Sequence, residues 1–546
     1  MLLLNAVGCT RRGQTSEPVD ETKTQLYVGC FEGGYGRTWL DNYAARFEEM
    51  YADEHFEEGK TGVQVHVMQS RDFGTSNILT TMANSESEIF FLEQSDYYQM
   101  VNRGLLLDIT EAVTTSLTEY GEDESIVGKM YDTDAAFYLT DDNKYYAVPA
   151  YEATYGIFYD IDMFEQNNFY FAAEGQGDSD GFVRNADTPR SNGPDGQPGT
   201  DDDGLPATYD EFFRLCDRIS ETSYAITWPG RSSHYVNALM MSLQADYEGP
   251  EQMMLNYTMS GRATNLVSSV SDDGTVTTYA DDITPATGYK LYKQAGRYYA
   301  LDFVQRLVAG SDDYYSYNDC FSSSQTHILS QSQFLQSRFS REIRDIAMLI
   351  DGTWWFNEAS RTFNEMANIP GASREERRIG MMPLPKVDDE HLGPSTYFSV
   401  YMTELCIKSN IAESKIPAAE AFLRFCRTNE SLSAFTADTN TTVPYDYTLE
   451  PEDEARITSY GKQLYDMHCN SVKVTPWAKN RVYLADSASF LAAEDAWISQ
   501  VGTDSYNIAT TAMHRLHGNL TARQYFDGLS VYNSETNWNN RYSAYF

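Results

Sequence analysis

Histidine, the residue type most often used in acid–base catalysis and metal binding, is scattered along this chain of 546 residues. Of the 8 histidines, only His514 and His517 are close together, and that pair is typical of a solvated helix face. The sequence contains no H-E-x-x-H, G-x-S-x-G or G-x-x-x-x-G-K-[ST] pattern. Metal-dependent hydrolysis, acyl transfer from a serine elbow and P-loop chemistry are therefore unsupported.

Three tryptophans indicate binding rather than catalysis, because each lies beside turn-forming residues. They are Trp228 in T-W-P-G, Trp354 in D-G-T-W-W and Trp477 in T-P-W. An indole on such a turn can stack on the apolar face of a sugar ring while nearby carboxylates accept hydroxyl hydrogens. The alternative is that these side chains pack in the core.

Residues 174–206 form an inserted loop rich in Gly, Asp, Asn, Ser and Pro. Carboxylates at alternate positions among glycines are typical of an oxygen-lined calcium loop, although the spacing does not match an EF-hand. A possible structural Ca²⁺ is one expectation, and a solvated acidic loop is the other. The candidate calcium ligands are Asp178, Asp180, Asp195, Asp201 and Asp203.

The net charge and the aromatic content restrict the kinds of molecule that the protein is expected to bind. The formal net charge is -40, which opposes binding to phosphate backbones and anionic lipid surfaces. We therefore expect no nucleic-acid partner. Aromatic residues make up 14% of the chain, with 40 tyrosines, and this favours a wide, uncharged ligand.

The N-terminus and the cysteines point to an anchored protein without a redox or zinc site. Residues 1–9 (MLLLNAVGC) resemble the lipobox of bacterial lipoproteins, in which the thiol of Cys9 would be acylated, although Ala6 stands where leucine is usual. Residues 1–23 would then be a signal remnant and tether; a frayed terminus is the alternative. No C-x-x-C pair occurs among the 7 cysteines, and spacing alone leaves open three disulfides or six thiols, with mostly free thiols favoured.

The elements that must position these residues begin as repeated βαβ units. Residues 25–31, 62–67 and 89–92 are predicted strands, and residues 38–52 a predicted helix. A glycine turn at 33–36 follows the first strand, where α/β folds bind ligands. It lacks the G-x-G-x-x-G fingerprint of dinucleotide binding.

Several segments, in order, resemble the family 1 extracellular solute-binding proteins of bacterial ABC importers, the group that includes maltose-binding protein. The matching segments cover nearly the whole chain: GLLLDIT at 104–110, YYAVPAYE at 145–152, YGIFYD at 155–160, LPATYDEF at 205–212, AMLIDGTW at 347–354 and IGMMPLP at 379–385.

This resemblance implies a two-lobed α/β fold of the periplasmic-binding-protein type II, with crossing strands as a hinge and a ligand cleft between the lobes. Lobe one would comprise 24–149 and 387–445, and lobe two 150–386 and 446–546. The acidic insertion departs from the maltose-binding type. The implied ligand contacts are Glu32, Tyr35, Tyr151, Glu152, Trp228 and Trp354, with looser correspondence for Glu93, Trp355 and Trp477.

The resemblance also implies a function. We expect a monomeric, lipid-anchored receptor on the extracellular face of the bacterial cytoplasmic membrane, which captures a carbohydrate without a required cofactor and delivers it to an ABC permease. The alternative from another class is a secreted glycoside-active enzyme with Glu152 and Asp351 as acid and base. A surface adhesin with a calcium-braced loop is a third interpretation.

Overall fold

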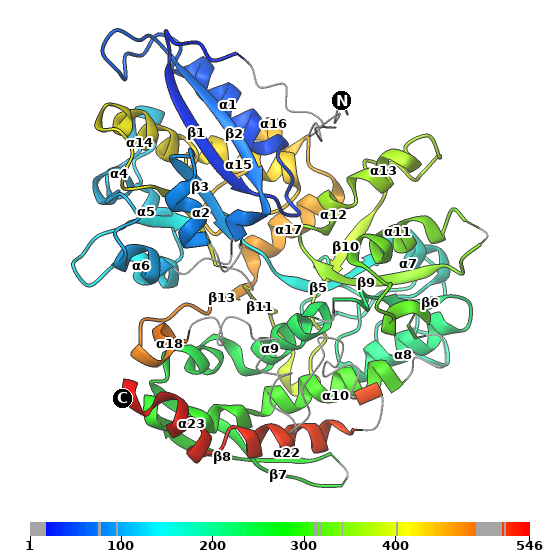
Figure 1. The fold of residues 1–546 in the computed structure, drawn as a ribbon. Coiled ribbons are helices and arrows are strands. Elements are labelled where there is room, and N and C mark those ends of the chain that lie inside the picture. The colour runs from blue at the N-terminus through cyan, green and yellow to red at the C-terminus, as the bar shows by residue number, and fades with distance from the viewer. Residues whose placement is uncertain are drawn as a thin grey trace, which may run out of the picture.

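Two separate β-sheets organise the structure (Figure 1). The strand order is β2-β1-β3-β12-β4 in the first sheet and β10-β5-β9-β6 in the second. The computed structural model describes residues 18–74, 78–93, 97–232, 234–272, 274–309, 315–316, 318–340, 342–399, 402–486, 516–517 and 520–546. The predicted lipid attachment at Cys9 lies outside the described residues, as does His514.

The first sheet starts with three parallel strands, β1 (Thr24–Phe31), β2 (Val63–Ser70) and β3 (Ile89–Glu93). Every residue of β3 is buried, which suits the apolar run Ile-Phe-Phe-Leu to the centre of a sheet. Helix α1 (Thr38–Met50) follows β1 and buries residues at helical spacing, including Phe47. The predicted strands and helix are confirmed.

Two antiparallel strands complete this sheet. Strand β12 (Thr403–Ile407) lies between β3 and β4 (Ala147–Pro149) and pairs antiparallel with both. The first sheet is therefore assembled from segments far apart in the sequence. Further helices in this half of the molecule are α2 (Ile78–Asn84), α3 (Tyr97–Asn102), α4 (Thr110–Thr114), α5 (Ile126–Lys129), α6 (Asp132–Tyr138), α14 (Ile416–Phe425), α15 (Asn429–Thr439) and α16 (Pro451–Glu454).

The second sheet is buried along all four strands: β5 (Tyr155–Asp160), β6 (Tyr224–Thr227), β9 (Ile346–Gly352) and β10 (Ile379–Met382). Strand β9 pairs parallel with β6 and antiparallel with β5. Its helices are α7 (Ile161–Asn167), α8 (Tyr209–Ser220), α9 (His234–Thr258), α10 (Ala295–Ala309), α11 (His327–Ser337), α12 (Trp355–Glu358), α13 (Ser360–Met366), α17 (Ser459–Asn470) and α18 (Arg481–Ala485).

The chain crosses between the two sheets more than once. Residues 150–154 connect β4 of the first sheet directly to β5 of the second. Strand β11 (Thr396–Phe398) precedes β12 and pairs parallel with β13 (Val472–Val474), forming a short ribbon at the junction of the lobes (Figure 1).

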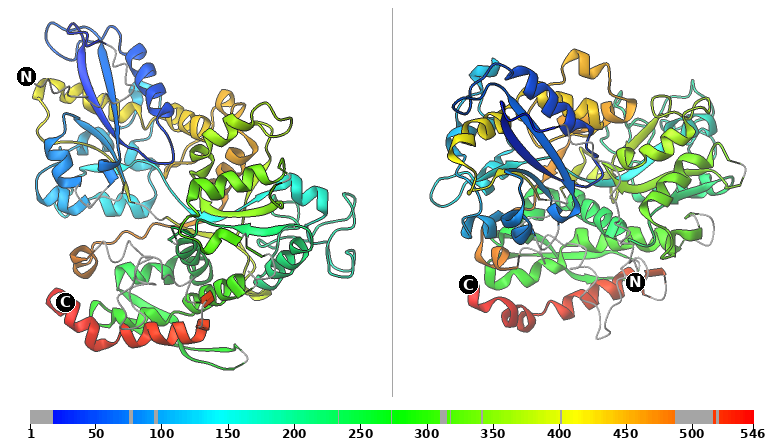
Figure 2. Two further views of the ribbon diagram at one scale, coloured as in Figure 1. Left: turned by 45° about the vertical axis from the view of Figure 1, so that its right-hand side comes forward. Right: turned by 45° about the horizontal axis from the view of Figure 1, so that its top comes forward.

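An additional layer covers the second lobe on the side away from the first (Figure 2). It contains the hairpin of β7 (Gly261–Val270) and β8 (Val276–Ile283), with helices α22 (Ala522–Tyr532) and α23 (Glu535–Tyr542). In the part of the chain that the structure describes, no helix has both the length and the apolar character needed to cross a membrane.

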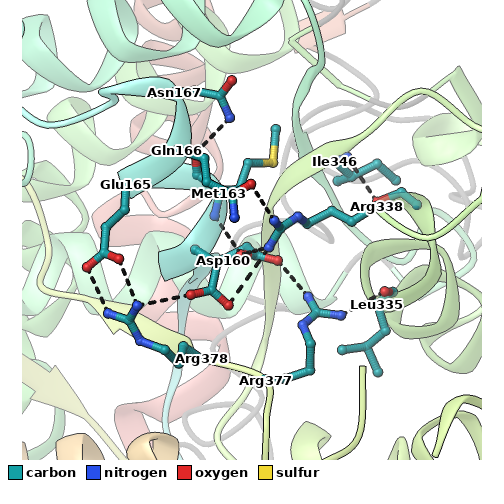
Figure 3. A network of polar contacts seen from close by, with 12 residues as sticks. Asp160, Met163, Glu165, Gln166, Asn167, Leu335, Arg338, Ile346, Arg377 and Arg378 are labelled. Atoms are coloured by element: carbon teal, nitrogen blue, oxygen red, sulfur yellow. Dashed lines mark hydrogen bonds and ion pairs between the residues drawn. The ribbon is translucent and has the colours of Figure 1, made fainter. Parts of the chain in front are cut away.

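A buried ion-pair network fixes the end of strand β5 (Figure 3). The Asp160 carboxylate caps helix α7 by accepting a hydrogen bond from the Met163 backbone N–H at 2.8 Å. It also accepts hydrogen bonds from Arg338 at 2.7 Å and Arg377 at 2.6 Å. Arg377 donates a further bond to the Leu335 carbonyl. Both charges of the Asp160–Arg377 pair are almost completely buried, so each depends on the other for its stability.

We predict that Asp160→Asn lowers the free energy of unfolding by about 3 kcal/mol, because it leaves buried guanidinium groups without a counter-charge. Chemical denaturation followed by circular dichroism measures the loss. The matched control is Asp162→Asn, which removes a solvent-exposed pairing with Arg378 and should cost less than about 1 kcal/mol. Equal losses of unfolding free energy in the two variants would contradict the claim that burial makes the Asp160 ion pairs costly to break.

Candidate ligand-binding site

The segment 150–154 positions two of the predicted ligand contacts at the junction of the lobes. The Tyr35 hydroxyl donates a hydrogen bond to the backbone carbonyl of Glu152, and the rings of Tyr35 and Tyr151 lie 4.5 Å apart. Thr403, the first residue of β12, donates from its hydroxyl to the Tyr151 carbonyl at 2.6 Å. The glycine turn after β1 and the crossing segment are therefore held together.

The loop after β1 contacts the second lobe through an indole. A Cβ atom added to Gly34 would lie 2.0 Å from Cδ1 of Trp354, which follows β9. Only glycine allows the backbone to approach this ring so closely. Trp354 is 6% exposed and packs edge-on against Tyr155 at 5.1 Å between centroids. Trp354 is thus part of the contact between the lobes.

Buried carboxyl groups flank this contact on both lobes. The Tyr151 hydroxyl donates to Glu93 at the end of β3, and burial raises the pKa of Glu93 to about 8. On the second lobe, the Gln331 amide donates to Asp351 at 3.1 Å and to Glu358 at 2.9 Å. Burial also raises the pKa of both of these carboxyls. Protonated carboxyls beside the contact between the lobes can donate hydrogen bonds to ligand hydroxyls.

Glu152 is held in a separate charged network. Lys473 of β13 pairs with both carboxylate oxygens at 2.8 Å and 3.0 Å, and His468 of α17 lies 3.1 Å from one of them. The Thr442 hydroxyl also donates to this carboxylate. Burial alone would raise the pKa of Glu152, but Lys473 and His468 outweigh it and hold the pKa below its usual range. Glu152 therefore joins the crossing segment to β13 and α17 as a permanent anion.

A first, small cavity of about 20 Å³ opens beside Glu152. Aromatic rings and polar groups alternate on its walls, as expected of a site for a ligand with apolar faces and many hydroxyls. Its lining includes Asp134, Tyr138, Tyr151, Glu152, Lys473 and Trp477.

Asp134 is the most unusual group in this cavity, which we call cavity 1. Its side chain is 1% exposed, and no described residue hydrogen-bonds to its Oδ1 atom. Burial, and then the charge of Glu152, raise the pKa of Asp134 to about 8, although the Trp477 side chain hydrogen-bonds to the carboxyl. An unsatisfied buried oxygen in a cavity wall is a position where a ligand hydroxyl would gain a hydrogen bond.

A second cavity, cavity 2, has a volume of about 40 Å³ and adjoins the first. Both are lined by Glu152, Thr154, Tyr397 and Lys473. The ion pair of Glu152 and Lys473 therefore lies between two open spaces at the lobe junction.

Comparison with known proteins identifies the fold and the family. A family model described as "Bacterial extracellular solute-binding protein" matches residues 43–454. The chain belongs to the bacterial extracellular solute-binding protein family. The predicted family resemblance and the predicted two-lobed α/β fold are confirmed. A search of curated proteins finds no match.

Solved structures similar to this solute-binding protein include sugar-binding proteins. A chitin oligosaccharide binding protein has a TM-score of 0.54 and 15% identity, with 94% of this chain and 99% of that chain covered. RafE from Streptococcus pneumoniae has a TM-score of 0.54 and 14% identity, covering 95% and 99%. Maltose-bound MalE3 from T. maritima has a TM-score of 0.51 and 12% identity, covering 93% and 99%.

Not all predicted contacts of this solute-binding protein lie at the junction. Tyr35, Glu93, Tyr151 and Trp354 are brought together there, and Glu152 and Trp477 line cavity 1. Glu32 is exposed beside the glycine turn and lines none of the described cavities.

Trp228 and Trp355 are corrections to the sequence-based site. Both are 0% exposed, so the structure places them in the core rather than on a cleft. Trp228 packs edge-on against Phe321 at 5.5 Å, and Trp355 lies against Phe334 and Phe356. A turn beside a tryptophan does not determine whether the ring faces outward or inward, and here burial of the large apolar ring prevails.

The described residues of the insertion do not bring the predicted calcium ligands together. In the described ranges, no three His, Cys, Asp or Glu side chains are placed to hold a metal ion. The aspartates instead cap backbone turns: Asp178 accepts from the N–H groups of Asp180 and Phe182, and Asp195 accepts from that of Gln197. The Asp203 carboxylate accepts a hydrogen bond from the Gly199 backbone N–H. Asp201 lies on the wall of a cavity described below.

The carboxyl pair of the enzyme hypothesis is divided between two networks. Glu152 is paired with Lys473, whereas Asp351 is completely buried and bonded to Gln331. A general acid or base must come within hydrogen-bond reach of the substrate, and the Asp351 side chain is 0% exposed. This geometry gives no support to Glu152 and Asp351 as an acid–base pair.

The residues that sequence reasoning missed are Asp134, His468, Lys473 and Tyr397. None belongs to a recognisable motif, and they come from α6, α17, β13 and β11. The isolated lysine in V-K-V, flanked by apolar residues at a strand, was the one usable signal, because a buried lysine requires an acidic partner.

We predict that Gly34→Ala disrupts the lobe contact, because the new methyl group overlaps the Trp354 ring. The expected loss is about 1–3 kcal/mol of unfolding free energy, with an increased radius of gyration in small-angle scattering. Gly128→Ala is the matched control, since its nearest described atom, the Ser125 hydroxyl oxygen, is 3.4 Å away. The loss should disappear in a Trp354→Ala background; its persistence there would contradict the proposed overlap.

We predict that Asp134→Asn flattens the pH dependence of stability. The native carboxyl holds its proton up to a pKa of about 8, while the unfolded one loses it near its usual pKa. The parent therefore loses stability as the pH rises from about 5 to 8, by up to about 1.4 kcal/mol per pH unit from this group. Thermal unfolding across that range measures the difference. Asp132→Asn on the same helix should keep the parent profile, and an unchanged slope in Asp134→Asn would refute the assignment.

Proposed function

We propose that this solute-binding protein is the receptor of a carbohydrate importer. The observation that carries the proposal is cavity 1, in which Trp477 and three tyrosines surround the unsatisfied Asp134 carboxyl oxygen. Such a wall complements an oligosaccharide, which offers apolar ring faces and hydroxyl groups together. Solved structures with a similar fold support this ligand class, since they include a chitin oligosaccharide binding protein and proteins bound to raffinose and to maltose.

Capture would use lobe closure around the junction. Tyr138 of α6 and Tyr151 of the crossing segment reach cavity 1 from one side of the junction, whereas Lys473 and Trp477 reach it from β13 and the segment after it. A ligand that touches both sides favours the closed arrangement by its differential affinity. This mechanism needs only contacts made by the chain and requires no cofactor.

We also propose where the receptor is attached and which partner it serves. The lipobox-like start would attach the protein through Cys9 to the outer face of the bacterial cytoplasmic membrane, where the monomer would deliver its sugar to an ABC permease. Metabolic labelling with a palmitate analogue tests the anchor, because label should be lost in Cys9→Ser.

The ligand is tested by titration calorimetry against a panel of neutral oligosaccharides. We predict that Trp477→Phe weakens binding of the best panel member about fivefold or more, because the smaller ring offers less stacking surface. The matched control is Trp538→Phe, since Trp538 lies in α23 and packs against Tyr542 in the outer layer. Absence of binding to every sugar by the folded parent would overturn the proposed ligand class.

A further inference from the structure

A third cavity, cavity 3, lies between the acidic insertion and helix α17. Its volume is about 490 Å³. Its lining includes Asp195, Asp201 and Asp202 of the insertion, and Asp466 of α17. The insertion, which departs from the maltose-binding type, thus forms one side of a space large enough for several sugar units.

The walls of cavity 3 are charged with one sign. Four carboxylates line it, and no lysine or arginine is among the described residues that line it. Asp202 is engaged with the Thr200 hydroxyl and the Asp195 backbone N–H. In contrast, no ion pair within 4 Å joins Asp201 or Asp466 to another described residue.

The carboxylates of the insertion and of α17 influence each other electrostatically. Burial, followed by the charge of Asp201, raises the pKa of Asp466, while Lys462 on the same helix acts in the opposite direction. Like charges across a partly buried space cost free energy unless a cation lies between them.

A buried hydroxyl faces the same space. Tyr397 is 3% exposed and lines cavities 1, 2 and 3. The Ser395 side chain is close to the Tyr397 hydroxyl. The Tyr397 hydroxyl nevertheless has no hydrogen-bond partner among the described residues. Tyr397, Met467 and Ser471 are shared by cavities 2 and 3, so the two spaces adjoin. An unsatisfied hydroxyl at this position would gain a hydrogen bond from a polar ligand.

A bare metal ion does not fit these walls. Its ligands must converge to about 2.3–2.6 Å from one point, and no group of three described His, Cys, Asp or Glu side chains does so. An amine-bearing saccharide has its own length and hydroxyl groups, and can therefore contact Asp201 and Asp466 without drawing them to one point.

We propose that cavity 3 binds the part of a saccharide ligand that carries a protonated amine, with Asp201 and Asp466 as its counter-charges and Tyr397 as a hydroxyl contact. This inference rests on the proposed function, because it names the ligand class that the carbohydrate site accepts: an oligosaccharide containing amino-sugar units.

The test compares two probes with the same sugar backbone, one with free amines and one with the amines acetylated. Glucosamine tetramer, which carries amines, and N-acetylglucosamine tetramer, which does not, are titrated into the full chain at about 20 mM and about 500 mM salt. The aminated tetramer should bind at least about tenfold more tightly at low salt, and lose most of that advantage at high salt. The double variant Asp201→Asn/Asp466→Asn should reduce binding of the aminated tetramer to the level of the neutral one.

The control is Asp187→Asn, which removes the same charge from an exposed position of the insertion and should retain the preference. Equal affinity of the parent for both tetramers would overturn this inference while leaving the carbohydrate receptor in place. Calcium that stabilises the parent but not the double variant would also overturn it in favour of a metal site. Failure of both tetramers and of every neutral sugar would instead reject the proposed function.

Discussion

The junction between the lobes depends on one pairing of buried charges. The Glu152 carboxylate lies in the crossing segment, and Lys473 of β13 and His468 of α17 compensate it. A buried carboxylate without partners costs several kcal/mol, so these three elements must meet at this point. Because the pairing occupies Glu152, ligand contacts in cavity 1 are left to its neighbours, among them Asp134, Tyr151 and Trp477.

Much of the fold could be predicted from the sequence because its signals are local or ordered along the chain. The apolar run before Glu93 predicts a central strand, and the helix after the glycine turn shows helical spacing of its buried residues. The ordered segments between 104 and 385 predicted the family correctly. The site was predicted less well, because side-chain direction is not a local property: Trp354 reaches the junction, whereas Trp355 beside it packs in the core.

The insertion illustrates a second limit of sequence reasoning. Alternating aspartates are compatible with both metal ligation and turn capping, because a carboxylate oxygen accepts equally from a cation or from a backbone N–H. Backbone donors nearby, such as those of Asp180 and Phe182, lie in the same turn as Asp178 and are reached at no cost in chain entropy. Asp134 could not be recognised either, since its importance arises from burial beside β13, which is distant in the chain.

The strand order of the first sheet has a consequence for how the protein is made. Strand β4 pairs with β12, whose residues are synthesised only after all four strands of the second sheet. During translation the second lobe can therefore acquire its strands while the first still lacks an inner one. A ribosome-bound chain ending before Thr403 would expose the edge of β3, an apolar strand with unpaired backbone groups. Chaperones that shield nascent sheet edges would be needed most over this interval.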